Sequence, residues 1–200
     1  MPERADISDK LIHFTKGNSW KDAFGTLRKI MSERRLLSGN YRIRGGYDCV
    51  CFTEAPLKAF ADRFFAQLAP SRYAPFGLMF NKSFVFAAGG RPVIYEPESE
   101  FMVLPEEIRW RHVRYEPTSE DPVDFTWERE WRIRCEEFPF STADAVIILP
   151  NGEWIDHLLA LHRHEQDMRV QAYSTVFDED EIYIAEQFRK EFKWRVESLG

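Results

Sequence analysis

The sequence lacks any long hydrophobic run, and its first residues lack the apolar core of a signal peptide. No window holds the roughly eighteen consecutive apolar residues that a membrane-spanning helix needs. The segment 1–10 instead carries four charged residues before Lys10, namely Glu3, Arg4, Asp6 and Asp9. We therefore expect a cytoplasmic protein that does not cross a membrane.

Cysteine is scarce, and the usual metal-binding patterns are missing. The 200 residues contain three cysteines, Cys49, Cys51 and Cys135. Zinc sites need four Cys or His ligands at recognisable spacing, and none lie near these cysteines, so we expect no metal site. Cys49 and Cys51 alternate along one apolar run and therefore share a strand face. This pattern predicts reduced, buried thiols.

Positive charge is also in the minority, whereas aromatic residues are abundant. Lys and Arg number 27 against 33 Asp and Glu, which gives a net charge of -6 and argues against a surface that coats nucleic acid. The stretch with Arg109, Arg111 and Arg114 allows either a local basic groove or a solvated strand edge. The aromatic fraction of 15% indicates a thick core, with some rings free to line a ligand cleft.

Length and pattern predict one α+β domain over 1–200, with a core over 11–150 and a helical C-terminal segment over 151–200. The βα alternation is too irregular for a doubly wound sheet. We expect strands at 11–15, 48–54, 76–80, 92–95, 109–115, 125–134, 145–149 and 170–173. We expect helices at 20–37, 57–68, 154–164 and 182–194, and a short one between Asn81 and Gly89.

Three polar clusters interrupt these elements. His13 and Thr15 share one face of the first strand; the alternative is a half-buried histidine without a function. Thr53 follows Phe52 at the end of the second strand and either lines a site or begins a turn. Glu128 and Glu130 stand two residues apart, between Trp127 and Trp131. On a strand they share one face, either as a partly desolvated catalytic pair or as part of an exposed edge with Glu–Arg ion pairs.

Taken in this order, the segments resemble the ADP-ribosyltransferase fold, DarT-type toxins included. The segment 11–15, with the helix that follows, resembles the first strand and helix of that fold; 49–54 resembles its second motif, and 128–131 its third. The segments 51–56 and 130–132 are also similar to the AbiGi-like family of abortive phage resistance proteins. The resemblance covers about residues 11–150. It implies a split β-sheet core with short peripheral helices and NAD in the cleft between the sheets.

The resemblance also implies roles for individual residues. The NAD-binding residues would be His13, Phe14, Thr15, Phe52 and Thr53. His13 would bond a ribose hydroxyl, the backbone at Phe14 would hold the nicotinamide amide, and Thr15 would brace the strand. Phe52 would lie beside the nicotinamide ring.

The catalytic residues would be Glu130, which would bond the nicotinamide ribose, and Glu128, which would orient the acceptor. His13 and Glu130 are then expected on one cleft. A variant with Gln at position 130 is expected to keep its fold and lose turnover.

The function that follows from the resemblance is an ADP-ribosyltransferase. It would use NAD to modify a macromolecular acceptor, protein or nucleic acid, in phage defence or a toxin–antitoxin system. A cognate toxin or antitoxin would be its partner. Two alternatives remain open at this point. One is a non-catalytic, antitoxin-like module on the same fold that binds a nucleotide or a protein. The other is an unrelated hydrolase or nuclease that uses Glu128, Glu130 and a histidine.

Overall fold

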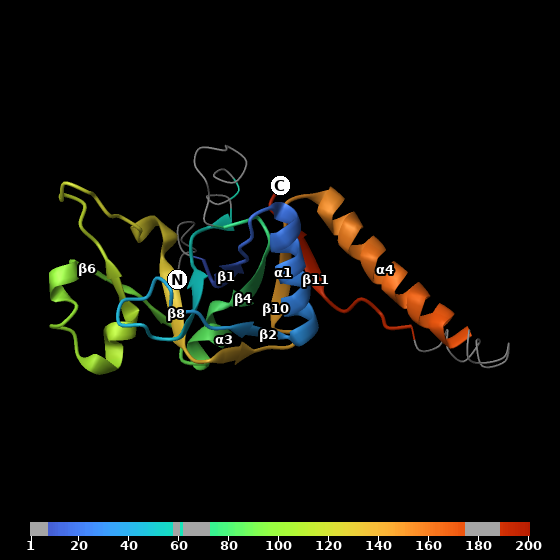
Figure 1. The fold of residues 1–200 in the computed structure, drawn as a ribbon, viewed down its shortest axis with the longest axis horizontal. Coiled ribbons are helices and arrows are strands. Elements are labelled where there is room, and N and C mark those ends of the chain that lie inside the picture. The colour runs from blue at the N-terminus through green and yellow to red at the C-terminus, as the bar shows by residue number, and fades with distance from the viewer. Residues whose placement is uncertain (1–7, 58–60, 62–72, 175–188) are drawn as a thin grey trace.

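The structure, a computed structural model, describes residues 8–57, 61, 73–174 and 189–200 (Figure 1). Its centre is a seven-stranded sheet in the order β11-β10-β4-β1-β3-β8-β5. The strands are β1 Lys10–Phe14, β3 Cys49–Thr53, β4 Gly77–Asn81, β5 Arg91–Pro92, β8 Glu130–Arg134, β10 Ala145–Leu149 and β11 Arg195–Ser198. All neighbours pair antiparallel except β10 and β11, which are parallel.

Two small ladders flank this sheet. β2 Arg35–Leu37 pairs antiparallel with β9 Glu137–Pro139, and β6 Ile94–Glu96 pairs parallel with β7 His112–Arg114. The 3₁₀ helices η1 Glu98–Glu100 and η2 Glu106–Arg111 lie between β6 and β7 in the chain. We call residues 94–115 the side lobe; they lie at the end of the molecule opposite α4 in Figure 1.

The described α-helices are α1 Trp20–Glu33, α3 Lys82–Ala87 and α4 Gly152–Ser174. The start of α1 follows from Ser19, whose hydroxyl accepts a hydrogen bond from the backbone N–H of Asp22. Its apolar stripe, Ala23, Phe24 and Leu27, is buried. Among the described residues, no helix combines the length and the apolarity needed to cross a membrane.

The two faces of the central sheet are buried by different elements. One face carries the main core, in which Leu11, Phe52, Phe80 and Ile147 pack against side chains of α1, α3 and α4. The other face carries a smaller apolar cluster around Ile12, Phe14, Met79, Val146 and Ile148. Because side chains alternate along a strand, each central strand contributes to both layers. The α+β class expected from the sequence is confirmed.

Several predicted elements differ in the structure. The predicted strand 109–115 is the end of η2 followed by the three residues of β7. The segment 92–95 is divided between β5 and β6. The segment 125–134 begins with the 3₁₀ helix η3 Thr126–Glu128, and only Glu130–Arg134 is strand. These stretches carry polar side chains that fold back onto nearby backbone, as when Trp110 donates its indole N–H to the carbonyl of Glu107.

The C-terminal segment is helical only in its first part. α4 extends from Gly152 to Ser174, so the predicted strand at 170–173 is wrong. Residues 189–194 of the predicted helix 182–194 are not helical; β11 then joins the central sheet beside β10. Most of that predicted helix, and most of the one at 57–68, lies outside the described residues. The strand β11 ties the C-terminal segment to the same sheet as the core.

Candidate functional site

A cavity of about 700 Å³ lies where β1, β3 and β8 face the side lobe and the loop 38–48. Small-molecule sites usually measure about 300–1,000 Å³, so the space suits a ligand of cofactor size. His13, Glu128, Glu130 and Arg132 all contribute to its wall. The structure thus brings His13 and Glu130 to one cavity, as the sequence predicts.

Strand alternation explains which side chains reach this cavity. β3 and β8 pair with Cys51 opposite Arg132 and Thr53 opposite Glu130, so these four side chains share one face. Phe52 and Trp131 point the other way, into the main core. The ring of Phe52 is 3% exposed. It packs edge-on against Phe80 and Phe138, and edge-on to His13. Phe52 contributes to the cavity wall, but its side chain packs mainly in the core.

Glu130 is held by a buried arginine. Arg132 donates Nε–H to one carboxylate oxygen of Glu130 at 2.8 Å and Nη2–H to the other at 3.3 Å. The side chains are 5% exposed for Arg132 and 15% for Glu130. Burial by itself lowers the pKa of Arg132, but the charge and hydrogen bonds of Glu130 outweigh it and raise the pKa. The guanidinium therefore stays charged beside the carboxylate.

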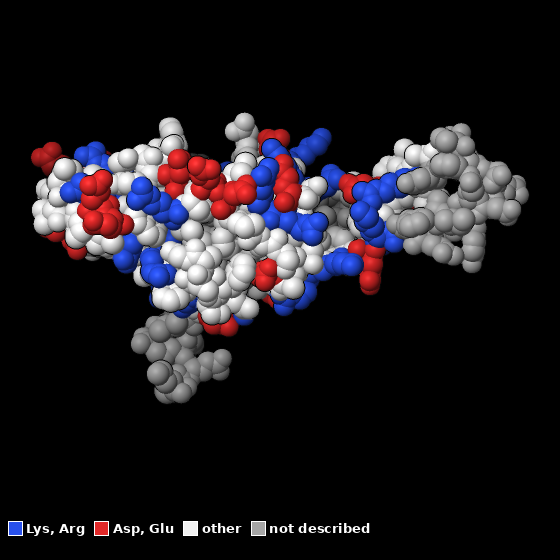
Figure 2. Space-filling view, turned by 90° about the horizontal axis from the view of Figure 1, so that it is seen from below, with Lys and Arg blue, Asp and Glu red and all other residues white. Residues whose placement is uncertain are grey.

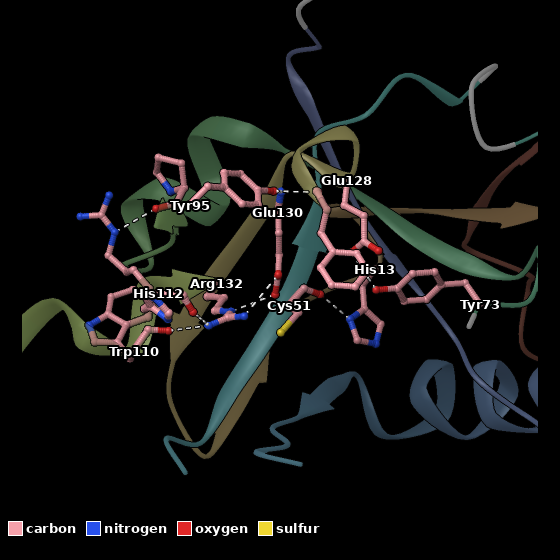
Figure 3. Close-up of polar contacts among 12 residues, drawn as sticks. His13, Cys51, Tyr73, Tyr95, Trp110, His112, Glu128, Glu130 and Arg132 are labelled. Atoms are coloured by element: carbon pink, nitrogen blue, oxygen red, sulfur yellow. Dashed lines mark hydrogen bonds and ion pairs between the residues drawn. The ribbon is translucent and has the colours of Figure 1, made fainter. Parts of the chain in front are cut away.

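Arg132 also connects this carboxylate to the side lobe. Its Nη1 donates to the backbone carbonyls of Trp110 and His112, each at 2.9 Å (Figure 3). A second connection comes from Tyr95 in β6, whose hydroxyl accepts the backbone N–H of Glu130 at 3.1 Å. Burial raises the pKa of Tyr95 to about 12, so the phenol stays protonated. The first residue of β8 is thus fixed through both its main chain and its side chain.

His13 lies where β1 and β3 part. The two strands share one paired position, Ile12 opposite Thr53. Beyond it, Nδ1 of His13 lies 2.8 Å from the carbonyl oxygen of Cys51 (Figure 3). A carbonyl only accepts, so Nδ1 carries the proton. Burial lowers the pKa of His13, which favours the neutral ring. Nε2 of the neutral ring is then an acceptor.

Glu128 reaches the cavity from a different element than Glu130. It ends η3 and is 7% exposed, and its carboxylate accepts a hydrogen bond from the hydroxyl of Tyr73 at 3.2 Å. Burial and the charge of Glu128 raise the pKa of Tyr73, so this phenol is a donor. The prediction that both glutamates lie on one strand face is wrong. Arg129, between them, is left-handed with φ 44°, a turn that directs both carboxylates to the same cavity.

Thr15 and Thr53 hydrogen-bond to the backbone around the site. Thr53 donates its hydroxyl to the backbone carbonyl of Glu128 and accepts the N–H of Ala55, so it anchors the end of η3. Thr15 is 2% exposed, and its hydroxyl lies 3.0 Å from the carbonyl of Phe76 and 3.1 Å from that of Ala23. Thr15 is not part of the cavity wall. Its position agrees with the bracing role that the resemblance implies.

Phe14 contributes to the cavity wall, and its ring is 5% exposed in the smaller apolar cluster, tilted toward Tyr73. The two tryptophans that flank Glu128 and Glu130 in the sequence also differ from expectation. Trp131 is in the main core and donates its indole N–H to Glu54 at 2.8 Å, whereas Trp127 is 38% exposed. The indoles therefore do not enclose the two carboxylates.

Sequence reasoning did not find Arg132, Tyr73 and Tyr95. Arg132 had a readable signal, because a charged residue between Trp131 and Ile133 in an apolar strand needs a partner on its own face, and Glu130 is two residues away. Tyr73 and Tyr95 come from other parts of the chain and had no such signal. Cys51 is a further unexpected neighbour of Glu130, since their side chains share one strand face in the cavity wall. Burial, and then the charge of Glu130, raise the pKa of the Cys51 thiol.

The rim of the cavity carries positive charge. Lys16 and Arg42 both contribute to the wall, and neither has a carboxylate within 4.0 Å among the residues that the structure describes. Arg44, also in the wall, pairs with Glu98 at 2.9 Å. No group of three or more His, Cys, Asp or Glu side chains in the described part of the chain is arranged to hold a metal ion. The site is one of carboxylates, phenols, a neutral histidine and cations at its rim.

Comparison with family models, curated proteins and solved structures finds no match for this chain.

Proposed function

We propose that the chain is an NAD-dependent ADP-ribosyltransferase, with NAD in the cavity beside Glu130 and a macromolecular acceptor, in phage defence or a toxin–antitoxin system. The observation that carries the proposal is the convergence of Glu128, Glu130 and His13 on one cavity at the point where β1 and β3 part. β1 and β3 share a single paired position and part beside His13, although both belong to one seven-stranded sheet rather than to the two separate sheets that the resemblance implies.

The chemistry of the transfer fits these groups. The bond between nicotinamide and C1′ of its ribose breaks, nicotinamide leaves with the bonding electrons, and the sugar develops oxocarbenium character. A fixed carboxylate in a partly dry cavity stabilises that charge. Glu130 pairs with Arg132 and is held in one orientation by two hydrogen bonds. The acceptor nucleophile, oriented by the nearby carboxylate of Glu128, then forms a bond to C1′ and releases its proton to water.

The remaining groups suit the rest of the dinucleotide. Nε2 of neutral His13 is an acceptor for a ribose hydroxyl. Lys16 and Arg42 supply positive charge at the rim, where it attracts the diphosphate. Phe52 packs mainly in the core and contributes only part of its surface to the cavity wall. Cys51 and Tyr73 contribute uncharged side chains to the same wall.

One observation favours a second candidate, a binding module of the same fold without catalysis. The charge of Glu130 is compensated by Arg132, and a compensated carboxylate attracts a developing cation less strongly. In this case the cavity would still bind a nucleotide, and nicotinamide would not be released.

The two candidates are separated by measuring NAD binding and nicotinamide release, with and without cell lysate as the acceptor source. We expect release by the wild type and a loss of about 10²–10³ in turnover for Glu130→Gln. For Glu128→Gln we expect reduced transfer to the acceptor with release partly kept. Glu137→Gln, at an exposed ion pair with Arg35, is the matched control. NAD binding without release supports the module, and absence of NAD binding refutes both candidates.

A further inference from the structure

A second cavity, of about 820 Å³, lies on another part of the molecule. It is bounded by the C-terminal half of α1, by α4 and by residues 189–194. It shares no lining residue with the candidate NAD cavity. The two spaces are therefore separate sites, and what fills the second is independent of the function proposed for the first.

Positive charge gathers in this second cavity, although the chain as a whole carries a net charge of -6. Two acidic residues, Glu165 and Glu191, contribute to its wall. Against them stand six cations: Arg28, Arg34, Arg169, Arg189, Lys190 and Lys193. We call this space the basic cavity. Figure 2 shows Lys and Arg side chains on both sides of the narrow part of the molecule from which the α4 end extends.

Most of this charge is not compensated within the described residues. Arg28 pairs with Glu165, and Arg189 pairs with Asp167 at 2.5 Å. The other four cations have no carboxylate within 4.0 Å in the ranges that the structure describes. Cations placed together repel one another unless an anion lies between them. The arrangement therefore favours an anionic ligand.

The backbone that carries part of this charge is fixed by two side chains of α4. His162 donates Nε2–H to the carbonyl of Lys190 at 2.8 Å, and the amide oxygen of Gln166 accepts the N–H of Lys190 at 3.0 Å. Gln166 is 6% exposed, and the ring of Phe192 packs edge-on against His162. The segment with Lys190 and Lys193 is thus held at a defined distance from α4 rather than lying loosely on the surface.

Arg34 adds an independent observation. It ends α1 in the left-handed conformation, with φ 53° and ψ 39°. That position strongly favours Gly, since a side chain there costs free energy. Strained residues cluster at sites where the side chain has a function. The side chain of Arg34 lines the basic cavity, so the costly residue and the uncompensated charge coincide.

We propose that the basic cavity binds a small organic anion with several phosphate groups, of the nucleoside polyphosphate class. Guanidinium groups donate paired hydrogen bonds to phosphate oxygens, and Arg34 and Arg169 come from two helices that face the same space. A long nucleic acid is disfavoured, because outside the cavity it meets a chain of net negative charge. The volume suits a ligand of nucleotide size.

The test is a calorimetric titration of the full chain with tripolyphosphate and with ATP, each at low and at high salt. We expect saturable binding at one site, weakened by salt. Arg34→Gly should weaken it about tenfold, since one charged hydrogen-bonding group is lost. Gly suits the left-handed position, so this variant should keep or raise its melting temperature. Arg169→Gln is the second variant, with the same expected loss.

Lys29→Gln is the matched control, because Lys29 is on the same helix, pairs with Glu33 at 3.8 Å and is not part of the basic cavity. Its binding should equal that of the wild type. Three results would overturn the proposal: no saturable binding of either probe, equal losses in the control and the Arg34 variant, or tighter binding of a single-stranded oligonucleotide than of ATP. Nicotinamide release, measured in parallel, should be the same in all three variants.

Discussion

Replacing Glu130 by Gln tests the ion pair on which the candidate site depends, and the structure changes the expected result. From the sequence, this change is expected to leave folding nearly intact, because amide and carboxylate have similar volumes. In the structure the carboxylate faces Arg132, whose side chain is 5% exposed. Gln removes the negative charge, so the buried guanidinium of Arg132 is left with uncharged hydrogen-bond acceptors and no counter-ion.

The magnitude follows from the contacts. Breaking a buried pair by removing one partner costs about 3–5 kcal/mol. The Gln oxygen keeps one of the two hydrogen bonds, worth about 1 kcal/mol, while its NH₂ faces a second donor. We therefore expect a loss of about 2–4 kcal/mol in the free energy of unfolding. For a chain of this length, that corresponds to a fall of about 5–15 °C in melting temperature.

The assay is urea unfolding and thermal unfolding of five proteins: wild type, Glu130→Gln, Arg132→Met, the double variant and the control Glu137→Gln. Removing both partners leaves no buried charge, so the double variant should be more stable than the sum of the single losses indicates. Glu137→Gln breaks an exposed pair and should leave the midpoint unchanged. A midpoint for Glu130→Gln equal to that of wild type would refute the assigned ion pair. Activity of this variant must be measured below its own melting temperature.

Two further predictions concern titratable groups around β3. The pKa of His13 is lowered in the folded chain from its ordinary value of 6.5, so the unfolded chain binds more protons below that pH. The free energy of unfolding should therefore fall as the pH is lowered through about 6.5. This pH-dependent loss of stability should be missing in His13→Gln. Identical pH profiles of the wild type and the variant in urea unfolding would contradict the prediction. Cys51 has a raised pKa in the folded chain and should react with iodoacetamide at pH 8 at least about tenfold more slowly than in urea, as followed by peptide mass; equal rates would exclude the buried thiol.

The strands of the central sheet were predictable because their signal is local. Apolar runs such as 11–15, 76–80 and 145–149 lie within one residue of β1, β4 and β10. The failures have a common cause. β11, β5 and the side lobe have no regular apolar pattern, and their strand or 3₁₀ geometry depends on partners distant in the chain, such as β10 for β11. The residues 195–198 show no strand periodicity, because β11 is stabilised by its pairing with β10.

The sequence pointed to some residues of the candidate cavity, but not to Arg132, Tyr73 and Tyr95 and not to its geometry. Alternation correctly places Thr53 and Glu130 on the β3 and β8 strands, but the same alternation sends the ring of Phe52 to the core. Glu128 was assigned to the strand because nothing in the sequence marks Arg129 as left-handed; Gly or Asn would have been the usual signal. The site departs from local rules where the chain turns between its two carboxylates.

The three candidate residues, His13, Glu128 and Glu130, are all positioned by the short strand β3. In β3, the carbonyl of Cys51 accepts a hydrogen bond from His13, the side chain of Cys51 shares a face with Glu130, and the hydroxyl of Thr53 donates to the carbonyl of Glu128. The core-facing residues of that strand, Val50 and Phe52, are buried at 1% and 3% exposure. Packing on one face therefore fixes the polar groups on the other before any ligand enters. Such preorganisation is what electrostatic stabilisation of a transition state requires, because groups already oriented need no rearrangement as charge develops.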